Sequence, residues 1–373
     1  MSKVLKIDKN AHEGVRELLR FLLENKKVKG VFALKKINEN GDVAYSLITN
    51  PDMVEAILPF FPFMPANAGK LLSHLTLTGP LKGPIAAVVR PCELRAFVEL
   101  VKREQGSLEN FLFISSSCGG VYPLEKSVNG DLSTDSELWS KYWDGVKNPE
   151  NQMADVRPTC KACEHFLPYS ADMTVLLLGN KAIDTECKIS LNTDKGEKFV
   201  DGIEGEFIEE EIENEALKLF RNKRIEEKEK LFAESQIEKF GMEGLIKTFG
   251  RCIGCHGCSN ICPICYCNLC TFDSRDYEYE PSTYETEIEK RGGIRVPPNT
   301  VFYHIGRLTH VGISCVGCGL CTDVCPADIP LSTIFLKVGE SVQKVFDYLP
   351  GKDVEEAIPL TTFETEEFTE VED

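Results

Sequence analysis

The sequence predicts an α/β domain joined to a bacterial-type dicluster ferredoxin module, and two observations support this fold class. In the first half of the chain, short apolar runs are followed by turns and helix-like segments, as in an open α/β sheet. In the last third, two cysteine runs share the spacing C-x2-C-x2-C-x3-C-P, the bacterial ferredoxin pattern for 4Fe–4S clusters. With 373 residues, the chain is long enough for both parts.

The α/β part opens with apolar residues at helical spacing in residues 11–25, followed by a strand-like run at 31–37. A buried strand is predicted at 85–89 and another at 111–114. Each ends in a short loop, and the first loop leads into a helix from about Glu93, because proline and an acidic residue suit a first helical turn.

Both loops carry residues that suit a ligand site. Arg90, Pro91 and Cys92 follow the first strand, and Cys118 follows the second, with Gly119 and Gly120 directly after it. Open α/β sheets bind ligands beyond the carboxyl ends of their strands. Glycines let the backbone approach a cofactor closely, so we expect these loops to face one.

Four cysteines of the α/β part are candidates for a further 4Fe–4S cluster. Two lie on the strand-end loops and two form a C-x-x-C pair, so four thiolates are able to converge, although any one of them is also explained as a buried core thiol. The candidate ligands of this cluster 3 are Cys92, Cys118, Cys160 and Cys163.

The two ferredoxin runs predict two cubanes. In such a pair the cysteine before proline ligates the other cluster, so the runs exchange their last cysteines. Cluster 1 is assigned to Cys252, Cys255, Cys258 and Cys325, and cluster 2 to Cys315, Cys318, Cys321 and Cys262. A single C-x-x-C also serves zinc or redox chemistry, but eight cysteines in this order favour cubanes.

Three further cysteines follow the first run. They lie in the segment between the two ferredoxin motifs, which is longer than in small ferredoxins. Cys265, Cys267 and Cys270 stand in six residues. With the isolated Cys187 they are candidates for a fourth cluster, and a core thiol is the alternative for Cys187.

The chain divides into four predicted segments. Residues 201–249 are rich in acidic and charged residues, which is typical of a linker with packing helices. The end of the chain is an acidic tail that is predicted to be either disordered or bound along the surface of a partner. It contains three separated apolar residues, Leu360, Phe363 and Phe368. The segments are 1–200 (α/β domain with the proximal cluster), 201–249 (acidic linker and helices), 250–345 (dicluster module with a long insertion) and 346–373 (acidic C-terminal tail).

The composition argues against several classes of partner. A formal charge of −17 and a pI near 5.0 disfavour nucleic acids and anionic membrane surfaces. No apolar run is long enough to span a membrane, and the first residues resemble neither a signal peptide nor a twin-arginine signal. We therefore expect a cytoplasmic protein, in which the clustered cysteines among the sixteen serve as metal ligands rather than disulfides.

The ordered motifs resemble one family. They are Arg90-Pro-Cys-Glu, Ser117-Cys-Gly-Gly, Cys160-x2-Cys163 before Ala171-Asp-Met-Thr-Val, and Cys262-Pro-Ile-Cys-Tyr-Cys. Over roughly residues 12–350 the chain resembles the beta-subunit family of coenzyme F420-reducing hydrogenases and F420-dependent formate dehydrogenases, some of them coupled to heterodisulfide reductase. The resemblance implies an α/β flavin-binding domain that exchanges a hydride between FAD and F420 and passes electrons along 4Fe–4S clusters to a catalytic subunit.

The resemblance also implies roles for particular residues. The four cysteines of cluster 3 match the family's flavin-proximal ligands, and Arg90, Arg95, Gly119 and Gly120 become candidate cofactor-binding residues. Either arginine is suited to a phosphate or the flavin edge, or else to a salt bridge. The family's Gly-Thr-Pro-Cys is Val89-Arg-Pro-Cys here, and its glycine-rich N-terminal loop is absent from residues 1–15, so the hydride donor stays open.

Three functions are therefore weighed. The first is a flavin and iron–sulfur beta subunit of a formate dehydrogenase or hydrogenase complex, in which FAD and clusters convert hydride transfer to single-electron transfer. No G-x-G-x-x-G follows a predicted strand and no molybdopterin or nickel site is recognisable, so the substrate-activating site is expected in another subunit. The alternatives are a non-catalytic ferredoxin-like electron wire and a beta-type subunit of a sulfite reductase or sulfhydrogenase.

Overall fold

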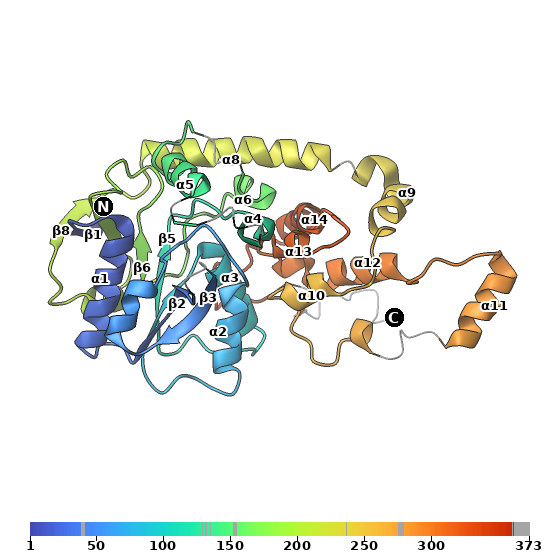
Figure 1. Ribbon diagram of the computed structural model, residues 1–373, viewed down its shortest axis with the longest axis horizontal. Coiled ribbons are helices and arrows are strands. Elements are labelled where there is room, and N and C mark those ends of the chain that lie inside the picture. The colour runs from blue at the N-terminus through green and yellow to red at the C-terminus, as the bar shows by residue number, and fades with distance from the viewer. Residues whose placement is uncertain are drawn as a thin grey trace, which may run out of the picture.

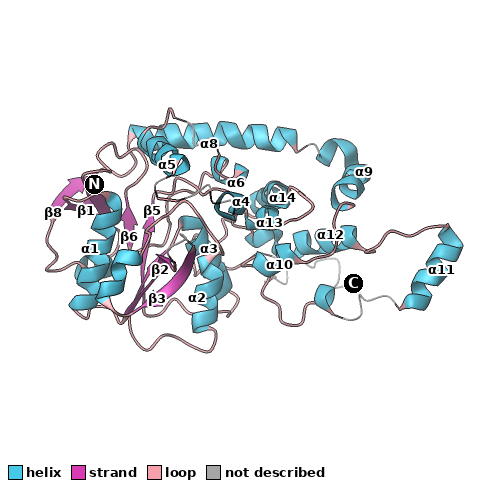
Figure 2. Cartoon of the chain, viewed as in Figure 1, coloured by secondary structure: helices cyan, strands magenta, loops and turns pink. Residues whose placement is uncertain are grey.

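The structure is a computed structural model of the 373-residue chain, shown in Figure 1. It describes all residues except 39–41, 129, 131–132, 135, 152–154, 236, 275–279, 360 and 362–373. The strands gather in one half of the molecule, whereas the other half, with the ferredoxin-type cysteines, consists of helices and loops (Figure 2).

One mixed sheet forms the centre of the first half. Its strands are β1 (Ser2–Ile7), β2 (Gly30–Lys36), β3 (Val43–Ile48), β4 (Ile85–Val88), β5 (Phe111–Ser116), β6 (Met173–Val175), β7 (Cys187–Leu191) and β8 (Glu206–Glu210). Their order is β3-β2-β4-β5-β6-β7-β1-β8. β2, β4, β5 and β6 run parallel, and the strands on either side pair antiparallel. The predicted α/β class is therefore confirmed.

The central strands are apolar on both faces because helices and loops cover both sides of the sheet. Every residue of β4 and β5 is buried. The helical elements of this half are α1 (Ala11–Glu24), η1 (Pro51–Ala56), α2 (Ala68–Thr76), α3 (Pro91–Val101), α4 (Leu124–Val128), α5 (Glu137–Lys147), α6 (Pro158–Lys161) and α7 (Asp194–Phe199). The parallel register pairs Ile85 with Phe111, which brings the loops after β4 and β5 to the same edge.

Several strands escape sequence-based prediction. β8 has the sequence Glu-Phe-Ile-Glu-Glu and is mostly exposed, so in the sequence it resembles an acidic linker. In the structure it pairs with β1 at the edge of the sheet, so the sheet continues beyond residue 200. The four-segment division of the chain is otherwise still a prediction.

The second half packs its helices around the cysteine runs. Its elements are α8 (Glu215–Glu234), α9 (Ile237–Phe249), α10 (Gly257–Ile261), η2 (Thr271–Asp273), α11 (Pro281–Arg291), α12 (Thr300–Val311), η4 (Gly312–Ser314), α13 (Leu320–Asp323) and α14 (Leu331–Val345). A separate core of Phe249, Ile329, Ile334 and Phe335 lies among them. α8 crosses above α5 and α6 toward α9, whereas α11 projects away from the other helices (Figure 1).

The beginning of the predicted C-terminal tail lies on α3. Gly351 donates its amide to Glu99 at 2.8 Å, and Arg95 donates Nε to the carbonyl of Pro350 at 2.8 Å. Leu360, Phe363 and Phe368 lie outside the described residues. None of the described helices combines the length and apolar character that a membrane crossing requires.

Candidate metal centres and an adjoining pocket

The turn after β4 is built on a buried carboxylate. Glu93 is fully buried in the first turn of α3 and accepts hydrogen bonds from the amides of Arg90 (2.8 Å) and Ala68 (3.2 Å). The Tyr45 hydroxyl also donates to it. Because a buried carboxylate needs such partners, this network fixes the turn that presents Cys92.

The structure brings the four candidate cysteines of cluster 3 to one place. Burial and then neighbouring charges raise the pKa of Cys92, and two of those neighbours are Cys118 and Cys160. Burial likewise raises the pKa of Cys160 to about 12, with Cys118 and Cys163 among its neighbours. A thiolate changes the pKa of another group only when it lies near it, and Cys163 is among the neighbours of both Cys118 and Cys160, so the four sulfur atoms form a group.

The glycines after Cys118 accommodate protein side chains. A Cβ on Gly119 would lie 2.6 Å from the Tyr142 hydroxyl. Gly120 has φ +101°, and a Cβ there would lie 2.9 Å from the Cβ of Cys160. Gly120 therefore permits the close approach of Cys160 to the Cys118 loop, and its amide donates to the Cys118 sulfur at 3.4 Å. A role for either glycine toward a cofactor is still a prediction.

Three cysteines of the first ferredoxin run are neighbours of one another and of Cys325 in the second run. Burial raises the pKa of Cys252, and the charges of Cys255 and Cys325 raise it further. Burial also raises the pKa of Cys258, and the charges of the neighbouring Cys252 and Cys255 raise it further. The first three cysteines of one run thus lie with the last cysteine of the other, although their role as ligands is a proposal.

The second ferredoxin group shows the same exchange. Burial raises the pKa of Cys318 to about 12, and the neighbouring thiols that raise it further are Cys262 and Cys315. Burial raises the pKa of Cys321 as well, beside the same three thiols. Within the described part of the chain, no three His, Cys, Asp or Glu side chains are close enough to hold a single metal ion. A cubane is wider than an ion, so thiols that surround one lie farther apart.

Buried arginines lie beside these groups, and no motif indicated them. Arg157, 1% exposed, forms an ion pair with Asp323 at 2.7 Å and donates to the carbonyls of Cys318 (3.1 Å) and Met64 (3.3 Å). It thereby joins the α/β half to the second ferredoxin group. Cys318 also lies beside Cys92, so the second and third groups are neighbours.

A second buried arginine contacts the first ferredoxin group. Arg307 is 3% exposed and donates Nη1 to the Cys258 sulfur at 3.0 Å and Nη2 to the Cys258 carbonyl at 3.1 Å. The Tyr303 hydroxyl lies 3.7 Å from the same sulfur and donates to Ser259 at 2.9 Å. With the Tyr303 proton directed to Ser259, Arg307 is the side chain that donates to the sulfur of Cys258.

Both arginines expected at a flavin have protein partners. Arg90, 4% exposed, donates to the carbonyl of Phe61, to Tyr45 at 3.3 Å, and lies 3.7 Å from Glu93. Arg95, 3% exposed, bonds the C-terminal segment as described above. Their binding of a phosphate or flavin is still a prediction, and neither lines the pocket described below.

The additional cysteines do not come together with Cys187. The Cys265 thiol donates to the sulfur of Cys262, and this hydrogen bond lowers the pKa of Cys262 to about 6. Cys267 is exposed, and it lines a cavity of about 550 Å3 with Cys265 and Cys270. Cys187 is instead fully buried in β7 within the core of the α/β half. Its place matches a core thiol.

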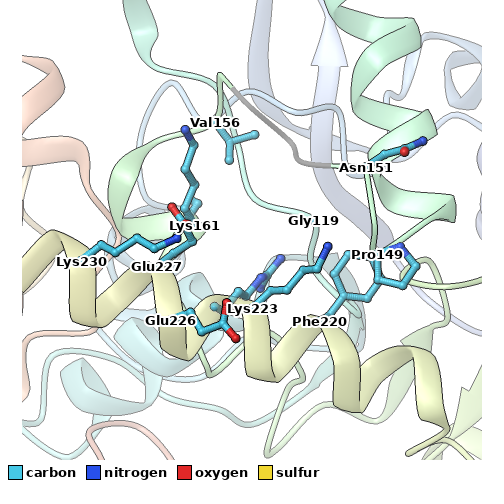
Figure 3. Close-up of a pocket in the computed structure, with 12 residues that line it drawn as sticks. Gly119, Pro149, Asn151, Val156, Lys161, Phe220, Lys223, Glu226, Glu227 and Lys230 are labelled. Carbon is cyan, nitrogen blue, oxygen red and sulfur yellow. Dashed lines mark hydrogen bonds and ion pairs between the residues drawn. The ribbon is translucent and has the colours of Figure 1, made fainter.

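A pocket adjoins the third group of cysteines (Figure 3). α8 forms one wall with Phe220 and Lys223, and Gly119 and Lys161 lie across from it. Cys160 also lines the pocket, whose volume is about 140 Å3, or about 700 Å3 with its open mouth. The lining carries four cationic side chains, those of Lys161, Lys223, Arg224 and Lys230, and two carboxylates, those of Glu226 and Glu227. The excess of positive charge next to a thiol group suits an anionic redox cofactor.

α8 is fastened to the cysteine loops at this pocket. Arg224, 5% exposed, donates to the carbonyls of Cys118 (2.9 Å) and Cys163 (3.2 Å) and lies over the ring of Phe166 at 4.7 Å. The pocket wall therefore has a fixed position relative to the thiols. The sequence indicated only a charged helix here, because arginine spacing on a helix does not reveal which loop it contacts.

Two formate dehydrogenase subunits are similar to nearly the whole chain. The F420-dependent formate dehydrogenase subunit beta of Methanocaldococcus jannaschii is 29% identical over 91% of this chain and 92% of its own length. The F420-dependent formate dehydrogenase 1 subunit beta of Methanococcus maripaludis is 28% identical over 92% of this chain and 91% of its own length. No family model matches the chain.

Two further similarities are partial. The sulfhydrogenase 2 subunit beta of Pyrococcus furiosus is 27% identical over 40% of this chain and half of its own length. Among solved structures, a chain of the xenon-derivatised F420-reducing [NiFe] hydrogenase complex of Methanosarcina barkeri has a TM-score of 0.43 and 13% identity, covering 65% of this chain and 94% of that one. On the two long similarities, the chain resembles the beta subunits of F420-dependent formate dehydrogenases, as its cysteine motifs predict, and is an oxidoreductase subunit.

Proposed function

We propose that the chain is the flavin and iron–sulfur electron-transfer beta subunit of a formate dehydrogenase or hydrogenase complex. One observation carries the proposal: Cys160 lines a pocket, Cys92 of the same group lies beside Cys318 of the second ferredoxin group, and Arg307 lies near both Cys262 of that group and Cys258 of the first. In this arrangement electrons pass between the pocket and the far cysteine group inside one chain. The long similarity to two F420-dependent formate dehydrogenase beta subunits supports it.

The donor sets fit the proposed cofactors. Cysteine thiolates are the usual ligands of 4Fe–4S clusters, and each of the three groups supplies four. The Cys262 thiolate is favoured before any metal binds, because the hydrogen bond from Cys265 lowers its pKa to about 6. Cluster 1 would use Cys252, Cys255, Cys258 and Cys325, cluster 2 Cys262, Cys315, Cys318 and Cys321, and cluster 3 Cys92, Cys118, Cys160 and Cys163.

The pocket beside Cys160 is the proposed site of FAD. A flavin accepts a hydride and releases electrons singly, which joins hydride chemistry to one-electron clusters. Lys161 and Lys223 line the pocket, and their charges suit the pyrophosphate of FAD. Glu226 and Glu227 line it as well, and Glu227 pairs with Lys230 at 2.8 Å. Coenzyme F420 or another hydride carrier would meet FAD here. The catalytic formate dehydrogenase or hydrogenase subunit, and heterodisulfide reductase subunits, would receive or supply electrons at the cluster end.

Anaerobic cofactor analysis tests this function. The reconstituted chain should contain about twelve irons, four for each cubane, and release FAD. Lys223→Glu should lower the bound flavin without changing the iron, because it reverses a charge on the pocket wall. Lys218→Glu is the matched control, since Lys218 lies on the same helix but pairs with Glu215 at 2.8 Å outside the pocket. Equal flavin loss in both variants would argue against the pocket.

A second candidate is the electron wire without flavin. It is favoured by the protein partners of Arg90 and Arg95 and by the side chains packed on Gly119 and Gly120. About eight irons and no flavin would support this candidate and contradict the first. A sulfhydrogenase-type beta subunit is supported only by the partial similarity.

A further inference from the structure

Arg307 is a buried cation whose described partners are sulfur atoms and a carbonyl. It is 3% exposed, and its Nη atoms donate to Cys258, with the sulfur of Cys265 farther away at 3.8 Å. No carboxylate of the described residues pairs with it, and its buried Nε has no hydrogen-bond partner there. Arg90 and Arg157 are equally buried, but each lies beside a carboxylate.

Because no described carboxylate pairs with Arg307, its positive charge must be balanced by another kind of anion. A buried guanidinium without an anionic partner is strongly unfavourable, and arginine does not lose its proton in proteins. The nearest anions available to Arg307 are the thiolates of Cys258, whose sulfur accepts from it at 3.0 Å, and of Cys262, which acts through space. Cys265 is instead the protonated donor to Cys262. The arginine therefore depends on negative charge at the cysteine group.

The position of Arg307 is fixed by its surroundings. Its guanidinium lies over the ring of Phe335 at 4.9 Å and near that of Tyr303 at 5.7 Å. Tyr303 is held in turn by Ser259. The hydrogen bond to the Cys258 sulfur is thus preorganised on α12, which makes it effective as a tuning contact.

We propose that Arg307 is a positioning residue that raises the reduction potential of the cluster on Cys252, Cys255, Cys258 and Cys325, making it the electron-accepting end of the series. The proposal rests on the proposed function for the presence of that cluster. Donated hydrogen bonds and nearby positive charge favour the more negative, reduced state of a cluster. The cluster gains one electron from its neighbour in the series, and no proton moves because Arg307 keeps its charge.

The direct bond makes the effect local. Arg307 donates at 3.0 Å to one ligand of this cluster, whereas it acts only through space on Cys262, Cys315 and Cys321, which are assigned to cluster 2. Coulomb interaction falls with distance, so the potential of cluster 1 should respond most. The resulting difference would direct electrons from the pocket toward cluster 1.

The experiment is an anaerobic redox titration of the reconstituted full chain, followed by EPR. Arg307→Met should disfavour reduction of one cluster about tenfold, which corresponds to about 59 mV for a one-electron couple, and shift the others less. Arg307→Lys keeps the charge without the forked donor and should give a smaller shift in the same direction. The control is Arg295→Met. Arg295 is exposed and donates at 2.5 Å to the carbonyl, not the sulfur, of Cys252 in the same group. Its charge also acts on the Cys252 thiol, but from a side chain that water screens, so its loss should shift the potential of cluster 1 much less than Arg307→Met does.

Iron content separates the possible failures. Unchanged potentials in Arg307→Met at wild-type iron content would overturn the proposal. If Arg307→Met loses iron, Arg307→Lys decides: an unchanged potential there would assign Arg307 a merely structural role and overturn the proposal equally. A wild-type chain that takes up no clusters would overturn the proposed function itself.

Discussion

Removal of the Arg157 side chain should loosen the junction between the two halves of the molecule. Its guanidinium is 1% exposed and connects Asp323 of α13 with the carbonyls of Met64 and Cys318. Replacement by methionine keeps much of the volume but removes the charge and every donor. Asp323 would retain the amide of Leu124, at 3.0 Å, as its described donor.

The cost follows from the burial of the pair. Breaking a buried ion pair by removing one partner costs about 3–5 kcal/mol. Burial already raises the pKa of Asp323 despite the neighbouring arginine, so the carboxyl will take up a proton more readily once Arg157 is gone. We therefore expect the lower end, about 3 kcal/mol, or roughly a hundredfold increase in opening of the junction.

Native-state hydrogen exchange measures that opening without assuming that the whole chain unfolds in one step. The amide of Leu124, which donates to Asp323, should exchange roughly a hundredfold faster in Arg157→Met, whereas amides of β1 should not change. Arg157→Met combined with Asp323→Leu should recover at least half of the loss, because no uncompensated charge stays buried.

An exposed ion pair provides the control. Lys3 and Glu197 are also 2.7 Å apart, but their side chains are 45% and 42% exposed. Lys3→Met should therefore cost at most about 1 kcal/mol. The reasoning would be refuted if Arg157→Met changed exchange at Leu124 less than threefold, or if the double variant were no better than the single one.

Three further predictions concern residues away from this junction. Cys187→Ala should leave the iron content unchanged and lower the free energy of unfolding by about 1 kcal/mol, because this thiol lies in the core. A loss of four irons would contradict that placement. Gly351→Ala should free the C-terminal segment, at a cost of about 1–3 kcal/mol, because φ is +71° and a Cβ would collide with the carbonyl of Arg95. Limited proteolysis with mass spectrometry measures this, with Gly202→Ala (φ +83°, no atoms nearby) as the control for backbone strain alone. Burial lowers the pKa of His304 to about 3, so below pH 6.5 the unfolded chain binds a proton that the folded chain excludes, and stability falls by up to about 1.4 kcal/mol per pH unit. Between pH 7 and pH 5, the Tm of His304→Phe should therefore decrease less than that of the wild type. Equal decreases would refute the claim that His304 stays unprotonated in the folded chain.

Local patterns predicted the elements that position the thiols. The apolar run before Arg90 and the Pro-Cys-Glu turn predicted β4 and the start of α3, because burial and first-turn chemistry act over neighbouring residues. The acidic edge strand β8 was missed because its apolar side chains are few and partly exposed. Arg157, Arg224 and Arg307 were also missed, since an arginine in a charged helix or loop carries no sign of the thiol group it contacts.

The cysteine spacing predicts which cysteines form each ferredoxin group, including the exchange of Cys262 and Cys325. The C-x-x-C spacing and the following proline constrain the backbone within a few residues, so this information is local. The folded chain was needed to show that Cys92 lies beside Cys318, that Cys160 lines a pocket with α8, and that Cys187 belongs to the core. These relations depend on how distant segments pack against one another, and packing is a property of the folded chain rather than of any spacing along it.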